Sequence, residues 1–405
     1  MNILDLPSEV LLVCLSYSRG TDVLNISQTC KLLNNLSETE SLWKAASQRE
    51  FGLDPRTALP CSFKYFYSKV LLRHGGIIGL WRNSTTCYGG LVHVWFTEKG
   101  TILAEELIPQ EIVTENMSKK SLFHIKVCDN EDIEVKRLLE FRGKHTMEII
   151  PDITGTFDTT DLCSFATLYK PIQDQEESQD NGEAEKTTFF NESRLQGTDP
   201  GLCSYKWDTL LRHYKTQRYE RIESSKCRHV DNVPIQPGFF KGMYGGHGTE
   251  VLHLYYDSNK PFGLVRKMSG DPNVPSGEIS ISFDMNKHMK LTRDQQLSLR
   301  DLEKISDEPS SETYCPYDPK KPCSQPFVCS RGAFMHGEVD DNIIPDRCIA
   351  RFHALGTVSP MGYTRPTKIP THFIVFNENL FGVIWLQLYS FSVFSRVTEE
   401  FPALR

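Results

Sequence analysis

From about residue 76 onward, the chain is a series of short runs rich in β-branched and aromatic residues that end at Gly, Pro or Asn. The first runs occupy 76–82, 89–97, 100–108 and 121–127, and the pattern resumes over 238–397. About ten strands at this spacing are typical of an antiparallel sheet or barrel, and closure into a barrel removes exposed edge strands. We therefore expect residues 76–400 to form an antiparallel β-barrel domain.

Residues 1–50 have a helical pattern instead. Pro7 suits the first turn of a helix, and Leu11 and Leu15 follow at helical spacing in a segment that is apolar on nearly every face. Further helices are predicted at 21–36 and 37–52. Three short helices bury little core and would gain from a partner surface. With a helical linker at 51–75, the predicted fold class is α+β.

Three segments interrupt the strand pattern. Residues 172–190 are acidic, polar and almost free of large apolar groups, which predicts a disordered insertion. Residues 203–225 place Trp207, Leu210, Leu211 and Tyr214 on one face of a predicted helix. Residues 302–345 are rich in Pro and Ser, which predicts a second mobile insertion.

Charge and composition exclude several kinds of partner. The net charge is -7, and no dense Lys/Arg run is present, so neither nucleic acid nor an anionic membrane is expected as a partner. No window approaches the roughly 20 apolar residues of a spanning helix. The N-terminus lacks the basic flank and cleavage site of a secretory signal, so we expect the twelve cysteines to be reduced thiols in the cytoplasm and nucleus.

Motifs for catalysis and cofactors are not found. The sequence has no nucleophile elbow, no His-Glu-x-x-His and no Walker loop, so we expect no catalytic residues and no cofactor. Cysteines and a histidine gather at Cys315, Cys323, Cys329 and His336, but their spacing lacks a Cys-x-x-Cys knuckle, and no metal site is predicted there.

The N-terminal segments "LDLPSEVLLVCLSY", "DVLNISQTCKLLNNL" and "SLWK" resemble an F-box. The segments "PGFFKGMYGGHGTEV", "SGDPNVPSG" and "FGVIWLQLYSFSVFSRV" resemble the F-box family's substrate domain of the cyclin D-binding type. The resemblance implies a non-catalytic substrate-recognition subunit of a Skp1–cullin–F-box ubiquitin ligase, joined through Skp1 to cullin-1 and a RING subunit. It also implies a barrel that captures the C-terminal end of targets such as D-type cyclins and C-terminally amidated proteins.

The opening helix supplies the predicted adaptor contacts. A handful of apolar side chains can anchor an interface at about 25 cal/mol per Å² of apolar surface removed from water. The alternative, that these side chains only fill the helical core, stays open for each residue of the set: Leu4, Leu6, Pro7, Val10, Leu11 and Leu15.

Two loops are candidates for binding a peptide end. The glycine-rich run 241–250 carries Lys241, Tyr244 and His247, and its missing side chains would let a ligand backbone approach. A phosphate cradle or a hairpin without ligand are the alternatives. In the second loop, Asp271 would repel a C-terminal carboxylate and accept hydrogen bonds from a carboxamide, with Asn273 adding its own amide. An Asx-turn that uses both side chains locally is the alternative.

Trp385 is an aromatic side chain in a predicted strand, which is typical of barrel core. Near the barrel mouth it could instead hold an apolar side chain of the target.

The family resemblance also implies that the domain can carry a zinc site. The corresponding region of this chain offers only His145 and Cys163, and two ligands do not make a structural zinc site. A rival interpretation is a lipocalin-like barrel that binds a small molecule.

Overall fold

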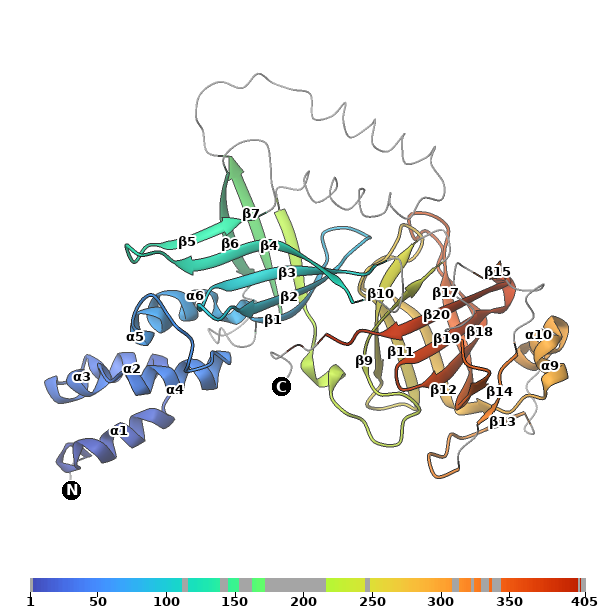
Figure 1. Cartoon of the computed structure of the whole chain (residues 1–405), viewed down its shortest axis with the longest axis horizontal. Coiled ribbons are helices and arrows are strands. Elements are labelled where there is room, and N and C mark those ends of the chain that lie inside the picture. Colours follow the sequence, from blue (N-terminus) through green and yellow to red (C-terminus); the bar gives the residue numbers. More distant parts are fainter. Residues whose placement is uncertain are drawn as a thin grey trace, which may run out of the picture.

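The structure, a computed structural model, describes residues 3–110, 116–138, 145–152, 162–171, 216–244, 248–307, 313–321, 324–328, 335–336, 344–399 and 401. The α+β fold class is confirmed: a helical N-terminal region precedes antiparallel sheets. Figure 1 shows the helices at one end of the molecule, a first sheet in the middle and a barrel at the other end. None of the helices in these ranges is long and apolar enough to span a membrane.

The N-terminal region is helical throughout, but the predicted second helix is broken in two. Its elements are η1 (Ile3–Asp5), α1 (Ser8–Tyr17), α2 (Gly20–Ser27), α3 (Lys31–Ser37) and α4 (Glu40–Phe51). The break is stabilised by polar side chains: Asn34 Nδ2 donates to the carbonyl of Ser27 at 3.1 Å, and Thr29 Oγ1 donates to the carbonyl of Ile26 at 2.7 Å. These bonds satisfy carbonyls that a helix end leaves without partners.

A second helical segment connects this region to the first sheet. It consists of α5 (Phe63–Phe66), the π-helical η2 (Tyr67–Leu71), α6 (Leu72–His74) and η3 (Gly75–Ile77). Glu50 joins it to the N-terminal helices, because one carboxylate oxygen accepts from the backbone N–H of Gly20 at 2.9 Å and the other from the Tyr67 hydroxyl at 2.6 Å. The carboxylate therefore lies at the N-terminus of α2, where the helix dipole favours negative charge.

The predicted strands are distributed over two large sheets. The first has the order β5-β4-β3-β2-β1-β8-β7-β6. Its strands are β1 (Gly79–Asn83), β2 (Leu91–Phe96), β3 (Ile102–Ile108), β4 (Ser118–Val127), β5 (Ile133–Arg137), β6 (His145–Asp152), β7 (Ser164–Pro171) and β8 (Thr216–Arg221). Its buried side chains and those of the helices form one continuous core.

One predicted helix is partly wrong. Residues 216–221 of the predicted helix 203–225 form β8, which pairs with β1 and β7, and residues 224–227 form the short helix η5 (Ser224–Cys227). Gln217 and Tyr219 are buried while Arg218 and Glu220 face out, so the period-two pattern of a strand overrides local helix propensity. Residues 203–215 of that prediction, and the predicted insertion 172–190, lie outside the described residues.

The second large sheet closes into a barrel of eight antiparallel strands. The order is β11-β10-β9-β20-β19-β18-β17-β12, and β11 also pairs with β12. The strands are β9 (Gly238–Met243), β10 (Thr249–Tyr256), β11 (Phe262–Lys267), β12 (Ile279–Met289), β17 (Ala350–Val358), β18 (Thr367–Asn377), β19 (Leu380–Trp385) and β20 (Ser390–Arg396). Aromatic rings fill its interior, among them Phe283 and Phe373, which stack at 4.1 Å.

Short elements pack on the outside of the barrel. They are α9 (Arg293–Leu297), α10 (Leu299–Asp307), β13 (Tyr314–Cys315), β14 (Gln325–Pro326), β15 (Met335–His336), β16 (Arg347–Cys348) and η8 (Leu386–Leu388). Several of them fall in the predicted mobile insertion 302–345. In the described part of that stretch, the apolar side chains of Leu302 and Phe327 are buried in a cluster with β18 and β20.

The two β units meet through backbone pairing and a shared apolar cluster. Gly90 donates to the carbonyl of Met268 at 2.9 Å, and Gly270 donates to the carbonyl of Tyr88 at 2.8 Å. Beside these bonds, Leu80 and Leu91 of the first sheet belong to one buried cluster with Phe239 of the barrel. The loop 268–278, which contains Asp271, is thus fixed between the units.

Candidate functional site

The start of the chain carries an exposed apolar surface, which we call the α1 stripe: Ile3 and Leu4 of η1, Pro7 at the N-cap of α1, and Val10, Val13, Cys14 and Tyr17 of α1. The four residues of α1 follow the spacing of one helical face. Tyr17 is 82% exposed and Val13 is 58% exposed, whereas large apolar side chains are usually covered.

The structure divides the predicted adaptor residues into two sets. Leu4, Pro7 and Val10 are exposed in the α1 stripe, and Leu6 is half-buried. Leu11 and Leu15 are 3% and 7% exposed and pack in the helical core, the alternative that the sequence left open for them. The sequence interpretation missed Val13, Cys14 and Tyr17, although they follow Val10 at spacings of three, four and seven residues, which are typical of one helical face.

The glycine-rich turn and the Asp271 loop lie at the same end of the barrel. Tyr244 follows β9, Lys267 ends β11 and Ile279 begins β12, and antiparallel neighbours place these strand ends together. Lys267 connects the two loops: its ammonium lies 4.5 Å from the ring centre of Tyr244 and 2.5 Å from Asp271 Oδ2. We call Tyr244, Glu250, Lys267, Asp271, Ser280 and Trp385 the barrel-end cluster.

The cluster contains three buried charged groups. Lys267 Nζ lies 2.8 Å from Glu250 Oε2 as well as 2.5 Å from Asp271, and all three side chains are nearly fully buried. Burial raises the pKa of Glu250 to about 8, with Lys267 opposing the shift and Asp271 adding to it. Burial opposes the charge of Lys267, but the two carboxylates outweigh it and raise the pKa of the amine.

Aromatic rings form the apolar part of the cluster. The Tyr244 ring lies 5.9 Å from that of Trp385 and 5.2 Å from that of Phe394, and its hydroxyl is 2.9 Å from Ser280 Oγ. Burial raises the pKa of Tyr244 well above its ordinary value, so the hydroxyl stays protonated. Trp385 is 3% exposed and belongs to the barrel core, as its alternation along the strand indicated.

The Asp271 loop has the local bonding of an Asx-turn. Asp271 Oδ1 accepts from the backbone N–H groups of Asn273 at 2.6 Å and Val274 at 2.9 Å. The amide of Asn273 donates to the carbonyl of Ser359 at 2.8 Å, which ties the loop to the segment after β17. The Asx-turn alternative therefore describes the bonds of Asp271, whereas the Asn273 side chain makes a long-range bond.

Two predicted residues are not part of the cluster as described. Lys241 alternates in β9 with Phe240, whose ring fills the barrel, so the Lys241 side chain lies on the outer face, away from Tyr244. His247 lies outside the described residues. Conversely, the sequence interpretation missed Glu250, Lys267 and Ser280; Glu250 near the start of β10 and Lys267 at the end of β11 are charged residues in strands that are mostly apolar.

Candidate metal ligands do not gather in the described ranges. Searched across those ranges, the structure has no group of three or more His, Cys, Asp or Glu side chains that could hold a metal ion. Cys315 Sγ lies 3.5 Å from His288 Nδ1, and Cys227 Sγ lies 3.4 Å from His253 Nε2. Burial raises the pKa of Cys227 to about 11, so this thiol is a poor nucleophile.

Two family models match this chain, one over the N-terminal helical region and one over the closed barrel. The F-box-like family model matches residues 3–49, and the Cyclin D1 binding domain model matches residues 219–400, which contain the whole closed barrel. F-box only protein 31 of Rattus norvegicus is 25% identical, with 99% of this chain and 85% of the relative covered. F-box only protein 31-A of Xenopus laevis is 26% identical at the same coverage, and F-box only protein 31 of Homo sapiens is 24% identical over 99% of this chain and 84% of the relative.

The helical region and the barrel thus each match a family model, and the similarity to the relatives extends across the first sheet between them. The chain thus combines a helical segment that is similar to F-box-like domains with a barrel that is similar to the Cyclin D1 binding domain.

Proposed function

We propose that this chain is the substrate receptor of a Skp1–cullin–F-box ubiquitin ligase, and that it binds the C-terminal ends of target proteins at the barrel-end cluster. The α1 stripe would dock on Skp1, which connects the chain to cullin-1 and a RING subunit. The chain would contribute proximity, because it holds a target near the activated ubiquitin of another subunit. Such a receptor acts in the cytoplasm and nucleus.

The observation that supports the substrate class is the charge balance of the barrel-end cluster. Lys267 contributes one positive charge and Asp271 one negative charge, and Glu250 adds a second negative charge once the pH exceeds its pKa of about 8. The cluster therefore has no surplus cation for a peptide carboxylate. A neutral carboxamide end suits it better, since it can donate to carboxylate or hydroxyl oxygens. C-terminally amidated proteins, and the tails of D-type cyclins, are the proposed targets.

The rival function, a lipocalin-like barrel that encloses a small molecule, is not favoured. As far as the structure describes the barrel, its interior is filled by its own aromatic side chains, including Phe352, Phe381 and Phe394. Eight-stranded barrels hold a ligand only when such side chains leave room.

The adaptor half of the proposal is tested on the α1 stripe. A charge at an exposed interface position costs desolvation on binding but little stability in the free protein, so Val13→Asp should weaken Skp1 binding about tenfold or more. Titration calorimetry with purified Skp1 measures the affinity, and thermal melting checks the fold. The matched control is Leu355→Asp, at an exposed apolar position on the barrel. Equal Skp1 affinity for wild type and Val13→Asp would contradict the proposed docking face.

A further inference from the structure

The loop that connects β1 and β2 of the first sheet, residues 84–90, packs directly on the Asp271 loop, residues 268–278. We call residues 84–90 the first-sheet loop. The two loops are joined by backbone hydrogen bonds: Gly90 N–H donates to the carbonyl of Met268 at 2.9 Å, Gly270 N–H to that of Tyr88 at 2.8 Å, and Ser276 N–H to that of Cys87 at 2.7 Å. A loop of one unit is therefore paired, backbone to backbone, with a loop of the other.

Two glycines make this close contact possible. Gly89 has a φ of 66°, and an added Cβ atom would lie 2.5 Å from the carbonyl oxygen of Met268 and would overlap the side chain of Ser276. At Gly270, an added Cβ atom would lie 2.8 Å from the carbonyl oxygen of Cys87. A side chain at either position would therefore force the two loops apart.

The contact between the loops reaches the buried charges of the barrel-end cluster. Burial raises the pKa of the Cys87 thiol, and the negative charge of Asp271 raises it further, so the carboxylate lies close to the first-sheet loop. The same carboxylate lies 2.5 Å from the ammonium of Lys267. Arg82 of β1 adds a side-chain bond, because its Nη1 atom donates to Ser276 Oγ at 3.2 Å.

The barrel supports the Asp271 loop from its own side. The carbonyl of Ser359 accepts from the Asn273 amide at 2.8 Å, and Gly362 N–H donates to the carbonyl of Pro272 at 2.7 Å. The Asp271 loop is therefore held between two supports, and loss of one of them would increase its motion. A binding group that is fixed before the ligand arrives discriminates better than one that must be ordered on binding.

We propose that the first-sheet loop is a positioning element of the barrel-end cluster, with Gly89 as its positioning residue. It holds Asp271 where the carboxylate can accept a hydrogen bond from a carboxamide end and repel a carboxylate end. Selectivity for peptide ends then requires the first sheet as well as the barrel. This role rests on the proposed function, because it concerns the same site.

The test compares Gly89→Ala with the wild type in the full chain. The probes are matched fluorescent peptides with the C-terminal sequence of a D-type cyclin and either a carboxamide or a carboxylate end. Fluorescence polarisation should show that Gly89→Ala lowers the preference for the carboxamide about threefold or more, as expected for about one hydrogen bond. Hydrogen exchange should become faster at the backbone amides of Asn273 and Val274, which donate to Asp271, while β18 keeps its protection.

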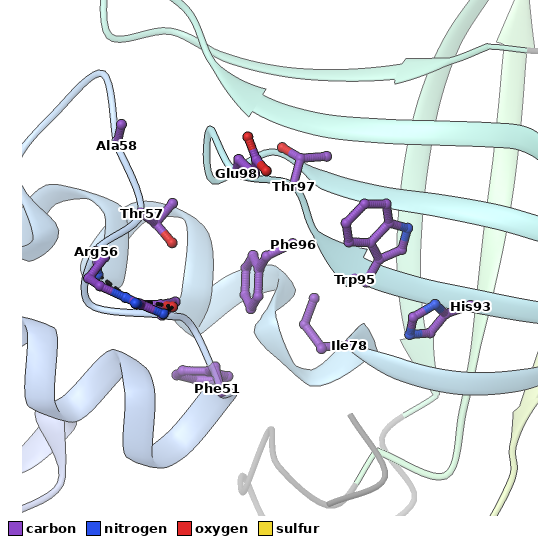
Figure 2. A pocket seen from close by; sticks show the side chains of 12 residues that line it. Phe51, Arg56, Thr57, Ala58, Ile78, His93, Trp95, Phe96, Thr97 and Glu98 are labelled. Carbon is purple, nitrogen blue, oxygen red and sulfur yellow. Dashed lines mark hydrogen bonds and ion pairs between the residues drawn. The ribbon is translucent and has the colours of Figure 1, made fainter. Parts of the chain in front are cut away.

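Gly52→Ala is the matched control for backbone strain. Gly52 has a φ of 74°, close to that of Gly89, but an added Cβ atom would meet no atom within 4 Å. It lines a cavity of about 640 Å³ that Figure 2 shows with Phe51 and Trp95 in its walls. The described lining of this cavity includes no residue of the first-sheet loop or of the barrel-end cluster. Gly52→Ala should therefore leave the peptide preference and the exchange of the Asp271 loop unchanged.

A second pair of variants tests the contact without a change of backbone. Arg82→Met removes the hydrogen bond to Ser276 and also the ion pair between Arg82 and Glu220 of β8. Glu220→Gln removes only the ion pair. Arg82→Met should therefore lower the carboxamide preference, by less than Gly89→Ala does, whereas Glu220→Gln should leave it unchanged.

The proposal is overturned if folded Gly89→Ala keeps the wild-type peptide preference, or if its exchange at Asn273 and Val274 equals that of Gly52→Ala. If Gly89→Ala does not fold, equal peptide preferences of Arg82→Met and Glu220→Gln overturn it. Equal affinity of the wild type for both peptides is a different result, because it contradicts the proposed function itself and the positioning role with it.

Discussion

The first sheet and the closed barrel each contain eight antiparallel strands, but different groups fill their interiors. The barrel closes through the β11–β12 pairing and packs its own aromatic rings inside. In the described residues the first sheet ends at β5 and β6, and its core is continuous with Phe66, Val70 and Leu71 of the connecting helices. The barrel therefore fills its interior with its own side chains and meets the first sheet only on its outer face, whereas the first sheet shares its core with the N-terminal helices.

The two units also differ in where they bury charge. The barrel holds Lys267 between two carboxylates at one end, where each group depends on the others for compensation. In the helical region the Arg56–Asp54 ion pair is exposed, with the Arg56 side chain 88% exposed, and the first sheet buries the single carboxylate of Glu106 rather than a charge cluster. Buried groups of this kind are costly unless fully paired, and their presence beside a surface loop is typical of a site rather than of a scaffold.

The largest expected effect is in the barrel. Lys267→Met removes the cation that pairs with the Asp271 carboxylate and the donor that bonds to Glu250, so the free energy of unfolding should fall by about 3–5 kcal/mol. Chemical denaturation followed by tryptophan fluorescence measures it. Arg56→Met is the control, since an exposed pair contributes about 0–1 kcal/mol. If Lys267→Met and Arg56→Met lowered the free energy of unfolding by the same amount, the proposed difference between the buried charges of the barrel and the exposed ion pair of the helical region would be contradicted.

A somewhat smaller effect should appear in the first unit. Leu71 is fully buried in η2, and Leu71→Ala should lower the free energy of unfolding by about 2–4 kcal/mol. Because the helices and the first sheet share one core, hydrogen exchange should increase in both β1 and α4, while β18 in the barrel stays protected. Increased exchange confined to the helices would show that the first sheet does not depend on them.

The smallest predicted effect is on pH dependence. The pKa of Glu250 is raised from 4.5 to about 8 in the folded state, so the unfolded chain releases this proton first. The stability that the group contributes is present below pH 4.5 and is lost as the pH rises through about 8. Between pH 6 and 8, wild-type stability should therefore fall by about 1 kcal/mol per pH unit more than that of Glu250→Gln. Parallel pH profiles for the two proteins would exclude a raised pKa at this position.

The sequence predicted which segments form strands better than it predicted how they pair. Runs of β-branched and aromatic residues bounded by Gly and Pro, such as those of β2 and β10, predicted strands, because the residues that end a strand and form a turn can be recognised in the local sequence. The pairing of β1 with β8 joins Trp81 to Arg221 across a long separation, and no local pattern encodes it. Assignment of the strands to two sheets therefore required the structure.

The candidate sites show the same limit. Apolar periodicity indicated an interacting helix, but it could not separate Leu11 in the core from Val13 on the surface, since the whole helix is apolar. In the barrel, Tyr244 and Asp271 were predicted from their loops. Their partner Lys267 was missed because a charged residue in a strand is usually solvated, and only the closed barrel shows that this one is buried.

The most direct test of the receptor proposal is the affinity of the full chain for matched peptides that differ only in a C-terminal carboxamide or carboxylate. Fluorescence polarisation should show tighter binding of the carboxamide form, a preference that Asp271→Asn reduces and that grows as the pH rises past 8 and Glu250 ionises. Equal affinities of the two peptides, or a preference that Asp271→Asn leaves unchanged, would contradict the role assigned to the barrel-end cluster.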